Sequence, residues 1–526
     1  MKKRTVLSAF IGLIIVGTTF LSAPLAAETR GKAEHVVVLV WDGMRPDFIT
    51  PQYTPTLYSL ARQGVYFNKH HPVFPSTTEV NGTALATGVY PNRNGILANS
   101  EYRPEISFLG GIATEGIDNV RRADFLTGGH YLLSPTLAET LQQAGYPTIT
   151  TGTKPVVLLH DRKPRRLTKV QTNSAVLFAG QTMPKSLLAD LEKANDNKKF
   201  PATNSTPNAA KDAWTTKAVL HGLWKKGVPK YTLLWLYDPD STQHAEGVGS
   251  DQALAGIVNS DKSLEDVLKY LDEKKLRDKT DVIVTSDHGF SNIKRGPDVV
   301  EALKKAKFKA VRKFEDPEPG EILVVGAGSA MSFYVVDHDV EVIRKLVAYL
   351  QGTDFTGVIF SRLAMEGTFP MEAARINTTN VVPDVVISMR WLEEAAENGT
   401  PGLVIADGGT RGKGTHGSLS RYDMHNIMVA AGPDFKRGLV DDLPTSGVDL
   451  APTILWILGV DPLQPMDGRV LHEALANSQV TPPIAETRTI EAISDLGWFR
   501  WIQYLKFTQM GQAIYLDEGN GGMKPK

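Results

Sequence analysis

Residues 35–43 read HVVVLVWDG, an apolar and mostly β-branched run that ends in Asp42 and Gly43. Strands that are apolar on both faces are typical of a parallel sheet covered by helices on each side. Similar runs occur at 231–240 (YTLLWLYDPD), 281–289 (DVIVTSDHG) and 425–433 (HNIMVAAGP), with helical patterns at 55–64, 135–145 and 261–276. This alternation predicts an α/β fold with a doubly wound, mostly parallel sheet.

Two segments interrupt the alternation. Residues at about 165–230 are polar and irregular, and residues at about 298–375 carry a helix–strand pattern of their own. We expect both to be insertions into a core of residues 34–475, the second forming a smaller α+β cap subdomain. Residues 476–526 begin with a Pro-containing stretch and end rich in Gly and Lys, so we expect a peripheral C-terminal tail.

The composition excludes several classes of function. The 526 residues carry a formal net charge of −1, so nothing predicts a nucleic-acid-binding surface. A basic cluster at 162–169 is interpreted as a solvated loop. The chain has no cysteine, which excludes disulfides, thiolate metal sites and a cysteine nucleophile. Any metal must therefore be held by His, Asp, Glu or hydroxyl oxygen.

The N-terminal residues 1–27 have the layout of a secretory signal peptide. Three basic residues precede an apolar run, which is followed by small residues and a cleavage position after Ala27. We therefore expect an exported protein, periplasmic or secreted, with an uncleaved membrane anchor as the alternative. No other segment is apolar over the roughly 20 residues that a membrane span requires. The sequence does not indicate an oligomeric state.

Polar side chains follow the predicted strands at the point where each strand ends. They are three aspartates and three histidines: Asp42, Asp240, His244, Asp287, His288 and His416. Ligand sites in open α/β sheets lie beyond the carboxyl ends of the strands, so these side chains are expected to converge. Together they suit zinc or a similar divalent ion. Each alone is weak evidence, because Asp337-His338 forms another Asp-His pair after another predicted strand.

The fragments occur in an order that resembles the alkaline phosphatase superfamily, and within it the nucleotide pyrophosphatase/phosphodiesterase branch. The resemblance extends over about residues 34–475. It rests on the motifs VWDGMRPDF, FPSTTEVNGTALATGVYPNRNGILANS, DPDSTQHAEG, VTSDHGF, GTHGSLSRYDMHNIMVAAGP and VDLAPTILWILGVDPLQPMDGRVL. It implies an alkaline-phosphatase-type core and hydrolysis of phosphoesters.

The resemblance also implies two metal sites, both expected to hold zinc. One consists of Asp240, His244 and His416, and the other of Asp42, Asp287 and His288, completed by the oxygen of Thr78. Thr78, at the start of the helix in PSxT, matches the nucleophile, and Asn99 matches the residue that holds a non-bridging phosphate oxygen. The chain departs from the family at Glu79, where relatives often carry an aromatic residue. Ser76 and Glu79 form an S-x-x-E pattern, which predicts a capping box, and Thr77 has no assigned role.

A bound cation makes threonine a usable nucleophile, because it stabilises the threonine alkoxide. The same effect lowers the pKa of metal-bound water. The expected reaction passes through a phospho-threonine and acts on a small phosphoester, with nucleotides as one class. A phosphomonoesterase or phosphonate hydrolase is the competing interpretation, because Lys154 could contact an additional phosphate charge. Val156 stands where a second basic residue is expected in such enzymes, which favours the diester. A sulfatase is disfavoured by the absence of a C/S-x-P-x-R motif, and a catalytically silent, exported metal-binding protein remains the alternative of another class.

Overall fold

The structure, a computed structural model, describes residues 30–162 and 174–526. The predicted signal peptide lies outside the described residues, and so do Lys163, Arg165, Arg166 and Lys169 of the basic cluster. The remaining member, Arg162, is buried and forms an ion pair with Asp124 at 3.2 Å, so it does not belong to a solvated loop. Among the described helices, none has both the length and the apolar character needed to cross a membrane.

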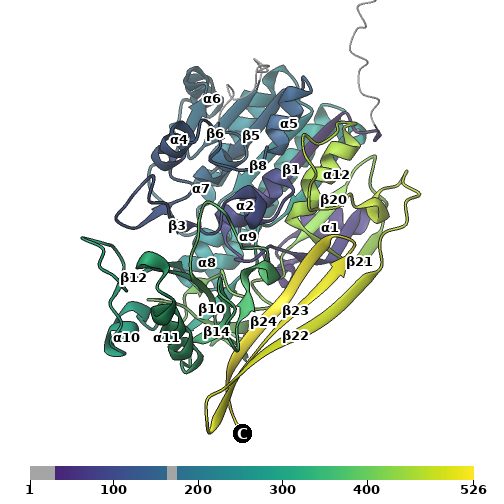
Figure 1. The fold of residues 1–526 in the computed structure, drawn as a ribbon. Coiled ribbons are helices and arrows are strands. Elements are labelled where there is room, and N and C mark those ends of the chain that lie inside the picture. The colour runs from purple at the N-terminus through teal and green to yellow at the C-terminus, as the bar shows by residue number, and fades with distance from the viewer. Residues whose placement is uncertain (1–29, 163–173) are drawn as a thin grey trace, which may run out of the picture.

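A nine-stranded sheet forms the centre of the described chain (Figure 1). Its strand order is β21 (Leu439–Ser446), β2 (Val65–His71), β20 (Met428–Ala431), β9 (Thr280–Thr285), β1 (His35–Trp41), β8 (Tyr231–Leu236), β5 (Thr148–Gly152), β6 (Ala175–Phe178) and β7 (Gln181–Met183). Strand β1 lies in the middle and pairs in parallel with both β8 and β9. The sheet is mostly parallel, as predicted.

Both faces of this sheet are covered by helices. Alternate residues of β1 enter different apolar clusters: Val36, Val38 and Val40 on one face, and Val37, Leu39 and Trp41 on the other. The first cluster includes residues of α2 (Thr78–Thr87), α5 (Leu137–Gln143) and α12 (Leu450–Ile457), and the second includes residues of α1 (Pro55–Gln63) and α9 (Asp251–Glu273). This double burial is why β1 is apolar throughout. The doubly wound α/β prediction is confirmed.

Two details of the sheet differ from the sequence prediction. Strand β20, within the fourth apolar run, is antiparallel to both β9 and β2. The predicted insertion at about 165–230 contributes β6 and β7 to the sheet itself, followed by α6 (Leu188–Ala194) and α7 (Ala209–Lys217). The short apolar run AVLF at 175–178 is buried and extends the parallel sheet beyond β5. Part of this segment therefore belongs to the core.

The predicted cap subdomain is present as a six-stranded sheet with helices α10 (Val299–Lys305) and α11 (Val340–Gln351). Its strand order is β11 (Ala310–Val311), β12 (Ile322–Ala327), β13 (Ala330–Val335), β16 (Val385–Met389), β14 (Thr356–Ser361) and β15 (Phe369–Pro370). Because β16 pairs with both β13 and β14, the subdomain extends past the predicted end at about residue 375. A separate four-stranded sheet combines strands from before and after the cap, in the order β17 (Trp391–Ala395), β18 (Pro401–Ile405), β10 (Ser291–Arg295) and β19 (Gly414–Thr415).

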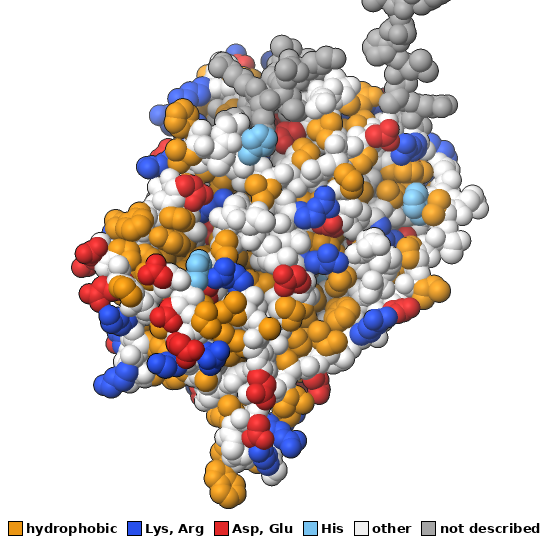
Figure 2. Space-filling model, viewed as in Figure 1, with side chains coloured by type: hydrophobic (Ala, Val, Ile, Leu, Met, Phe, Trp, Pro, Cys, Tyr) orange, Lys and Arg blue, Asp and Glu red, His pale blue; other side chains and the backbone are white. Residues whose placement is uncertain are grey.

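The C-terminal residues form an antiparallel sheet, which differs from the predicted peripheral tail. Strands β22 (Ala485–Asp495), β23 (Phe499–Met510) and β24 (Ala513–Pro525) make the long yellow arm in Figure 1. Alternation along β23 turns Trp501 and Leu505 inward, where both are fully buried against the cap. The Tyr90 hydroxyl also donates a hydrogen bond to the Ile514 carbonyl at 2.8 Å. The arm is therefore packed onto the rest of the molecule, while its tip projects outward (Figure 2).

Candidate active site

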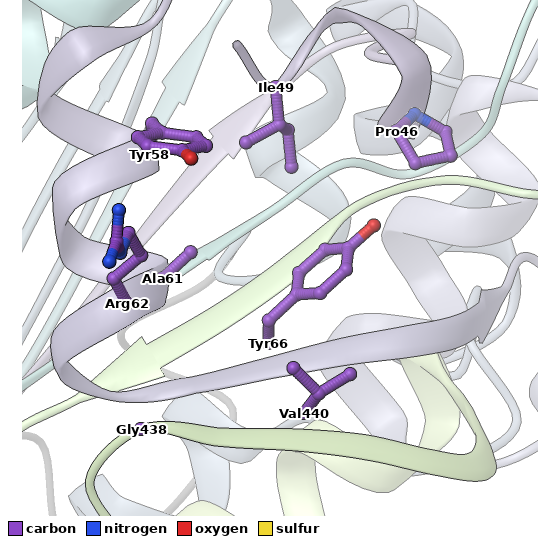
Figure 3. A pocket seen from close by; sticks show the side chains of 8 residues that line it. All are labelled: Pro46, Ile49, Tyr58, Ala61, Arg62, Tyr66, Gly438 and Val440. Carbon is purple, nitrogen blue, oxygen red and sulfur yellow. The ribbon is translucent and has the colours of Figure 1, made fainter. Parts of the chain in front are cut away.

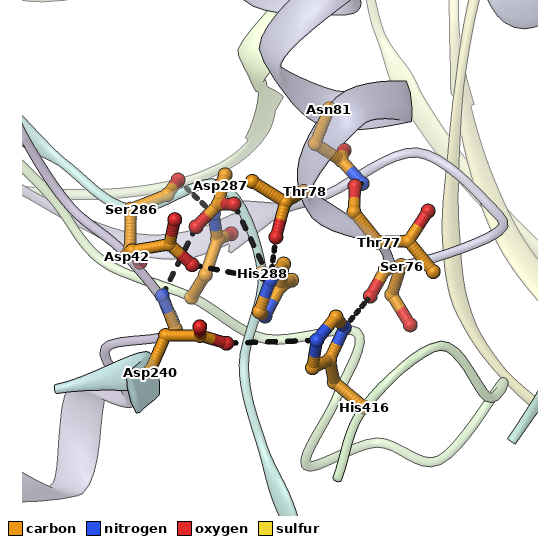
Figure 4. A network of polar contacts seen from close by, with 12 residues as sticks. Asp42, Ser76, Thr77, Thr78, Asn81, Asp240, Ser286, Asp287, His288 and His416 are labelled. Carbon is orange, nitrogen blue, oxygen red and sulfur yellow. Dashed lines mark hydrogen bonds and ion pairs between the residues drawn. The ribbon is translucent and has the colours of Figure 1, made fainter. Parts of the chain in front are cut away.

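The predicted ligands converge at the carboxyl ends of the central strands (Figure 4). Asp42 directly follows β1, and Asp287 and His288 follow β9. Asp240 and His244 lie one turn apart on α8 (Asp240–Glu246), the helix after β8. The remaining residue, His416, follows the short strand β19.

Two groups of three ligand atoms result, and they match the two predicted sets. In the first, the Nε2 atoms of His244 and His416 lie 3.3 and 3.5 Å from Asp240 Oδ1. In the second, His288 Nε2 lies 3.5 Å from Asp42 Oδ1 and 3.3 Å from Asp287 Oδ2. Ligand atoms bound about 2.1 Å from a tetrahedral ion are about 3.4 Å apart. The spacing in both groups therefore suits a divalent cation.

The three histidines are oriented by backbone carbonyls. His244 Nδ1 lies 3.0 Å from the Gly414 oxygen, His288 Nδ1 lies 2.8 Å from the Gly289 oxygen, and His416 Nδ1 lies 2.8 Å from the Ser76 oxygen. A carbonyl can only accept, so each Nδ1 carries a hydrogen and each Nε2 of a neutral ring presents a lone pair to the carboxylates. Metal-binding histidines are held in the same way.

The carboxylates also fit a bound cation. Asp42 Oδ1, Asp240 Oδ1 and Asp287 Oδ2 are buried and have no hydrogen-bond partner. The opposite oxygens are supported, since Trp235 Nε1 donates to Asp42 Oδ2 at 2.8 Å and the Gly43 amide donates to Asp287 Oδ1 at 3.0 Å. A buried oxygen without a partner costs about 1–3 kcal/mol or more if it is charged. A cation between these oxygens and the Nε2 atoms removes that cost.

Burial also sets the protonation of the site. It raises the pKa of Asp42 to about 7 and, together with repulsion from Asp42, raises the pKa of Asp287 well above its usual range. Burial lowers the pKa of His288 to about 3 and that of His416 well below its usual value. The two imidazoles are therefore neutral at pH 7, the form in which histidine binds metals.

Thr78 is the first residue of α2 and points into the second group of ligands (Figure 4). Its Oγ1 lies 3.2 Å from His288 Nε2. The capping-box prediction is wrong, because the residue before the helix is Thr77 and no side chain caps it. Instead, Ser76 Oγ donates to the Ser418 carbonyl at 2.8 Å, and the Ser76 carbonyl accepts the hydrogen of His416.

Lys154 is buried beside the same carboxylates. Its Nζ lies 2.9 Å from Asp42 Oδ2, 3.2 Å from Asp240 Oδ2 and 3.4 Å from Thr78 Oγ1. Burial alone would lower the pKa of Lys154, but Asp240 and Asp42 raise it well above its usual value. The ammonium is therefore charged and close to the threonine oxygen. Val156 is buried against the core and supplies no second polar group.

An acidic pair adjoins the threonine. Glu79 is buried, and burial followed by repulsion from Glu115 raises its pKa well above the usual range. The pKa of Glu115 is also raised by burial. The Asn99 Oδ1 accepts a hydrogen bond from the Glu79 amide at 3.2 Å, which places Asn99 at the first turn of α2. Sequence reasoning missed Glu115, because it lies in a loop without a strand or helix pattern.

A cavity of about 350 Å³ opens beside Lys154 and is lined by residues of the segment after β6. Glu115, Lys154, Tyr237, Phe200 and Lys211 are among its walls. A second cavity, of about 430 Å³, lies between α1 and strands β2 and β21 (Figure 3). Its lining includes Tyr58, Arg62 and Tyr66 but none of the predicted site residues. The first cavity is therefore the one that adjoins the candidate site.

Comparison with known proteins shows the family to which the chain is similar. The pattern of the type I phosphodiesterase / nucleotide pyrophosphatase family matches residues 36–419. The chain is 23% identical to mouse (Mus musculus) ectonucleotide pyrophosphatase/phosphodiesterase family member 7, over 87% of this chain and 90% of the relative. A Schizosaccharomyces pombe protein described as an uncharacterized pyrophosphatase/phosphodiesterase is 39% identical, but the match covers 13% of this chain and 14% of that protein. In a Caenorhabditis elegans ectonucleotide pyrophosphatase/phosphodiesterase, the match covers 26% of the relative.

Solved structures show the same fold. An inactive variant of murine ectonucleotide pyrophosphatase/phosphodiesterase 5, in complex with AMP, has a TM-score of 0.60 and 18% identity, covering 84% of this chain and 100% of that chain. Human ectonucleotide pyrophosphatase/phosphodiesterase 5 gives a TM-score of 0.59 with 16% identity, at the same coverage of both chains. The family pattern extends over well more than half of the sequence, from β1 to the loop that carries His416. The chain belongs to the type I phosphodiesterase / nucleotide pyrophosphatase family.

Proposed function

We propose that this protein is a metal-dependent phosphoester hydrolase that cleaves phosphodiesters through a covalent intermediate on Thr78. The observation that carries the proposal is the position of Thr78 Oγ1, 3.2 Å from His288 Nε2, at the edge of two clusters of buried carboxylates and imidazoles. We propose that Asp240, His244 and His416 hold one zinc ion, and that Asp42, Asp287 and His288 hold a second with the help of Thr78. Two imidazoles with a carboxylate, or two carboxylates with an imidazole, are ligand sets that zinc accepts.

Each group at the site has a separate role in the proposed reaction. When bound, the two cations supply the charge that stabilises the threonine alkoxide and the oxygen of the leaving group. Thr78 Oγ attacks phosphorus and the ester bond to the leaving oxygen breaks, which leaves the phosphoryl group on Thr78. Water then breaks the new bond and restores the hydroxyl. The Lys154 ammonium, 3.4 Å from Thr78 Oγ1, adds positive charge where negative charge develops.

Substrate orientation is assigned to the start of α2. The N-terminus of this ten-residue helix would offer backbone N–H groups and the positive end of the dipole to a phosphate that reacts with Thr78. Asn99 lies at the same turn and would bind a non-bridging phosphate oxygen through its amide nitrogen. The cavity beside Lys154, with Phe200 and Tyr237 in its walls, offers aromatic surface to the organic part of the substrate. Because a related structure contains AMP, we include nucleotide diesters among the candidate substrates.

A phosphomonoesterase is the second candidate, because Lys154 and Lys211 both line the cavity beside the site and could meet the additional charge of a monoester. The buried apolar Val156 favours the diester. The test compares bis-p-nitrophenyl phosphate, p-nitrophenyl phosphate and a dinucleotide with the zinc-loaded enzyme. We expect the highest kcat/KM for a diester. A clear preference for the monoester would refute the diester assignment, and no hydrolysis by zinc-loaded protein would favour a silent metal-binding protein.

We also propose that the protein is exported, on the basis of the charged, apolar and small-residue pattern of residues 1–27. N-terminal sequencing of the mature protein from the cells that produce it tests this. A chain that begins close to Glu28 is expected, whereas an intact Met1 in the cytoplasmic fraction would contradict export.

A further inference from the structure

A third cluster of metal-ligand side chains lies outside the site described above. It joins three parts of the chain that are far apart in sequence: His71 at the end of β2, His425 in the loop before β20, and Asp517 on β24 of the C-terminal arm. One ligand atom of each residue lies within 4.8 Å of the other two. Two imidazoles and one carboxylate form a ligand set that suits zinc or a similar first-row divalent ion.

The contacts inside this cluster meet at a single nitrogen. His71 Nε2 lies 3.0 Å from His425 Nε2 and 2.9 Å from Asp517 Oδ1. Without a hydrogen, His71 Nε2 repels the Asp517 oxygen, and it can accept a hydrogen bond only from the Nε2–H tautomer of His425. A hydrogen on His71 Nε2 can point well at only one of them. A cation between the three atoms satisfies all of them at once, after small outward shifts to the spacing of about 3.4 Å expected for tetrahedral ligands.

The surroundings favour ligation by the same atoms. His71 Nδ1 faces the Thr445 carbonyl oxygen at 3.4 Å, the arrangement that directs Nε2 towards a metal. The His71 side chain is 1% exposed and that of Asp517 is 14% exposed, so the cluster is sheltered and still reachable from solvent. Two positive charges lie nearby. Lys506 Nζ is 4.0 Å from Asp517 Oδ2, but its side chain is 43% exposed and can turn outward, and Arg421 is paired with Glu518.

We propose that His71, His425 and Asp517 form a third divalent-cation site, separate from the catalytic pair, that fastens the C-terminal sheet to the catalytic core. Two of the ligands belong to the core, and the third belongs to β24. The arm can be released only if a ligand leaves the ion, so metal binding stabilises the docked arrangement. The site needs no substrate and does not depend on the proposed hydrolase activity.

The proposal is tested by comparing the zinc content per chain of the wild type with that of variants that lack one ligand. Protein stripped with a chelator and reloaded with zinc is desalted and analysed by plasma mass spectrometry, for the wild type, His425→Gln and Asp517→Asn. Each variant is expected to hold one zinc ion fewer than the wild type. The matched control is His338→Gln, which removes an imidazole paired with Asp384 outside the three clusters and should not change the content. Equal zinc content in all four proteins would overturn the proposal and leave the cluster as a proton-bridged contact.

A measurement on the wild type guards against a variant that does not fold. Crystals grown with zinc are expected to show an anomalous peak bounded by His71 Nε2, His425 Nε2 and the Asp517 carboxylate. No peak there at saturating zinc would refute the proposal. Hydrogen exchange of the β24 amides tests the tethering role separately, because these amides exchange when the strand opens. At a free zinc concentration 100 times the Kd of the site, their exchange rate should fall about 100-fold. Exchange in β24 that does not respond to zinc would refute the tether.

Discussion

Replacing Lys154 with methionine should destabilise the protein when the site is metal-free and have little effect when zinc is bound. Without metal, the Lys154 ammonium is the positive group facing Asp42 at 2.9 Å and Asp240 at 3.2 Å. Removing one partner from a buried ion pair costs about 3–5 kcal/mol, because the remaining charge is left uncompensated. With about 2.1 cal/mol/K of unfolding entropy per residue, a chain of this length loses about 1 °C in Tm for each kcal/mol. The metal-free variant should therefore melt about 3–5 °C below the metal-free wild type.

Zinc should remove most of this difference, because the bound cations then balance the carboxylates. Differential scanning calorimetry of chelator-treated and zinc-loaded protein measures both states. Lys211→Met is the matched control, since Lys211 is 9% exposed, as Lys154 is, but its Nζ contacts the Asn204 amide oxygen instead of a carboxylate. An equal loss of Tm in both metal states of Lys154→Met, or no loss without metal, would refute this account of the site.

Three further predictions concern the surroundings of the site. Trp235→Phe removes the 2.8 Å hydrogen bond to Asp42 Oδ2 and should weaken zinc binding about 10–100-fold in a chelator competition, whereas unchanged affinity would contradict the supporting role. Burial lowers the pKa of His160 to about 3, so the folded state stays neutral while the unfolded chain takes up a proton below about pH 6.5. Stability from this group is present above pH 6.5 and is lost as the pH falls towards 3. Between pH 6.5 and 5.5, the free energy of unfolding of His160→Leu, measured by denaturant titration, should therefore fall by about 1 kcal/mol less than that of the wild type; parallel curves would exclude this contribution. Gly82→Ala would place a Cβ 2.7 Å from Val156 Cγ2 and should destabilise the protein by about 1–3 kcal/mol; a denaturation midpoint equal to that of the wild type would show that α2 can move away from the sheet.

Much of the fold could be predicted because the central strands are apolar on both faces. The residues of β1 show this, since Val38 and Leu39 enter opposite apolar clusters. The direction of β20 could not be predicted, because an apolar run has the same appearance in either orientation. The docking of the C-terminal arm depends on contacts such as Tyr90 with Ile514, which lie more than 400 residues apart. No local pattern encodes such a pairing.

The ligands of the candidate site could be predicted because their positions are tied to strand ends. Asp42 and Asp287 each follow a strand that the sequence identifies, and the parallel pairing of β1 and β9 brings them together. The residues that support the ligands could not be predicted in this way. Trp235 reads as an ordinary core residue in its strand, and the role of Ser76 depends on its contacts with His416 and Ser418. These roles follow from tertiary contacts alone.

Turnover by zinc-loaded Thr78→Ala, with zinc content measured on the same sample, tests the central claim most directly. Thr78→Ser keeps a hydroxyl on the first residue of α2 and serves as the matched control. The account predicts that Thr78→Ala retains most of its zinc and loses diester hydrolysis by about 10³-fold or more, while Thr78→Ser keeps measurable activity. Hydrolysis by zinc-loaded Thr78→Ala at the wild-type rate would contradict it.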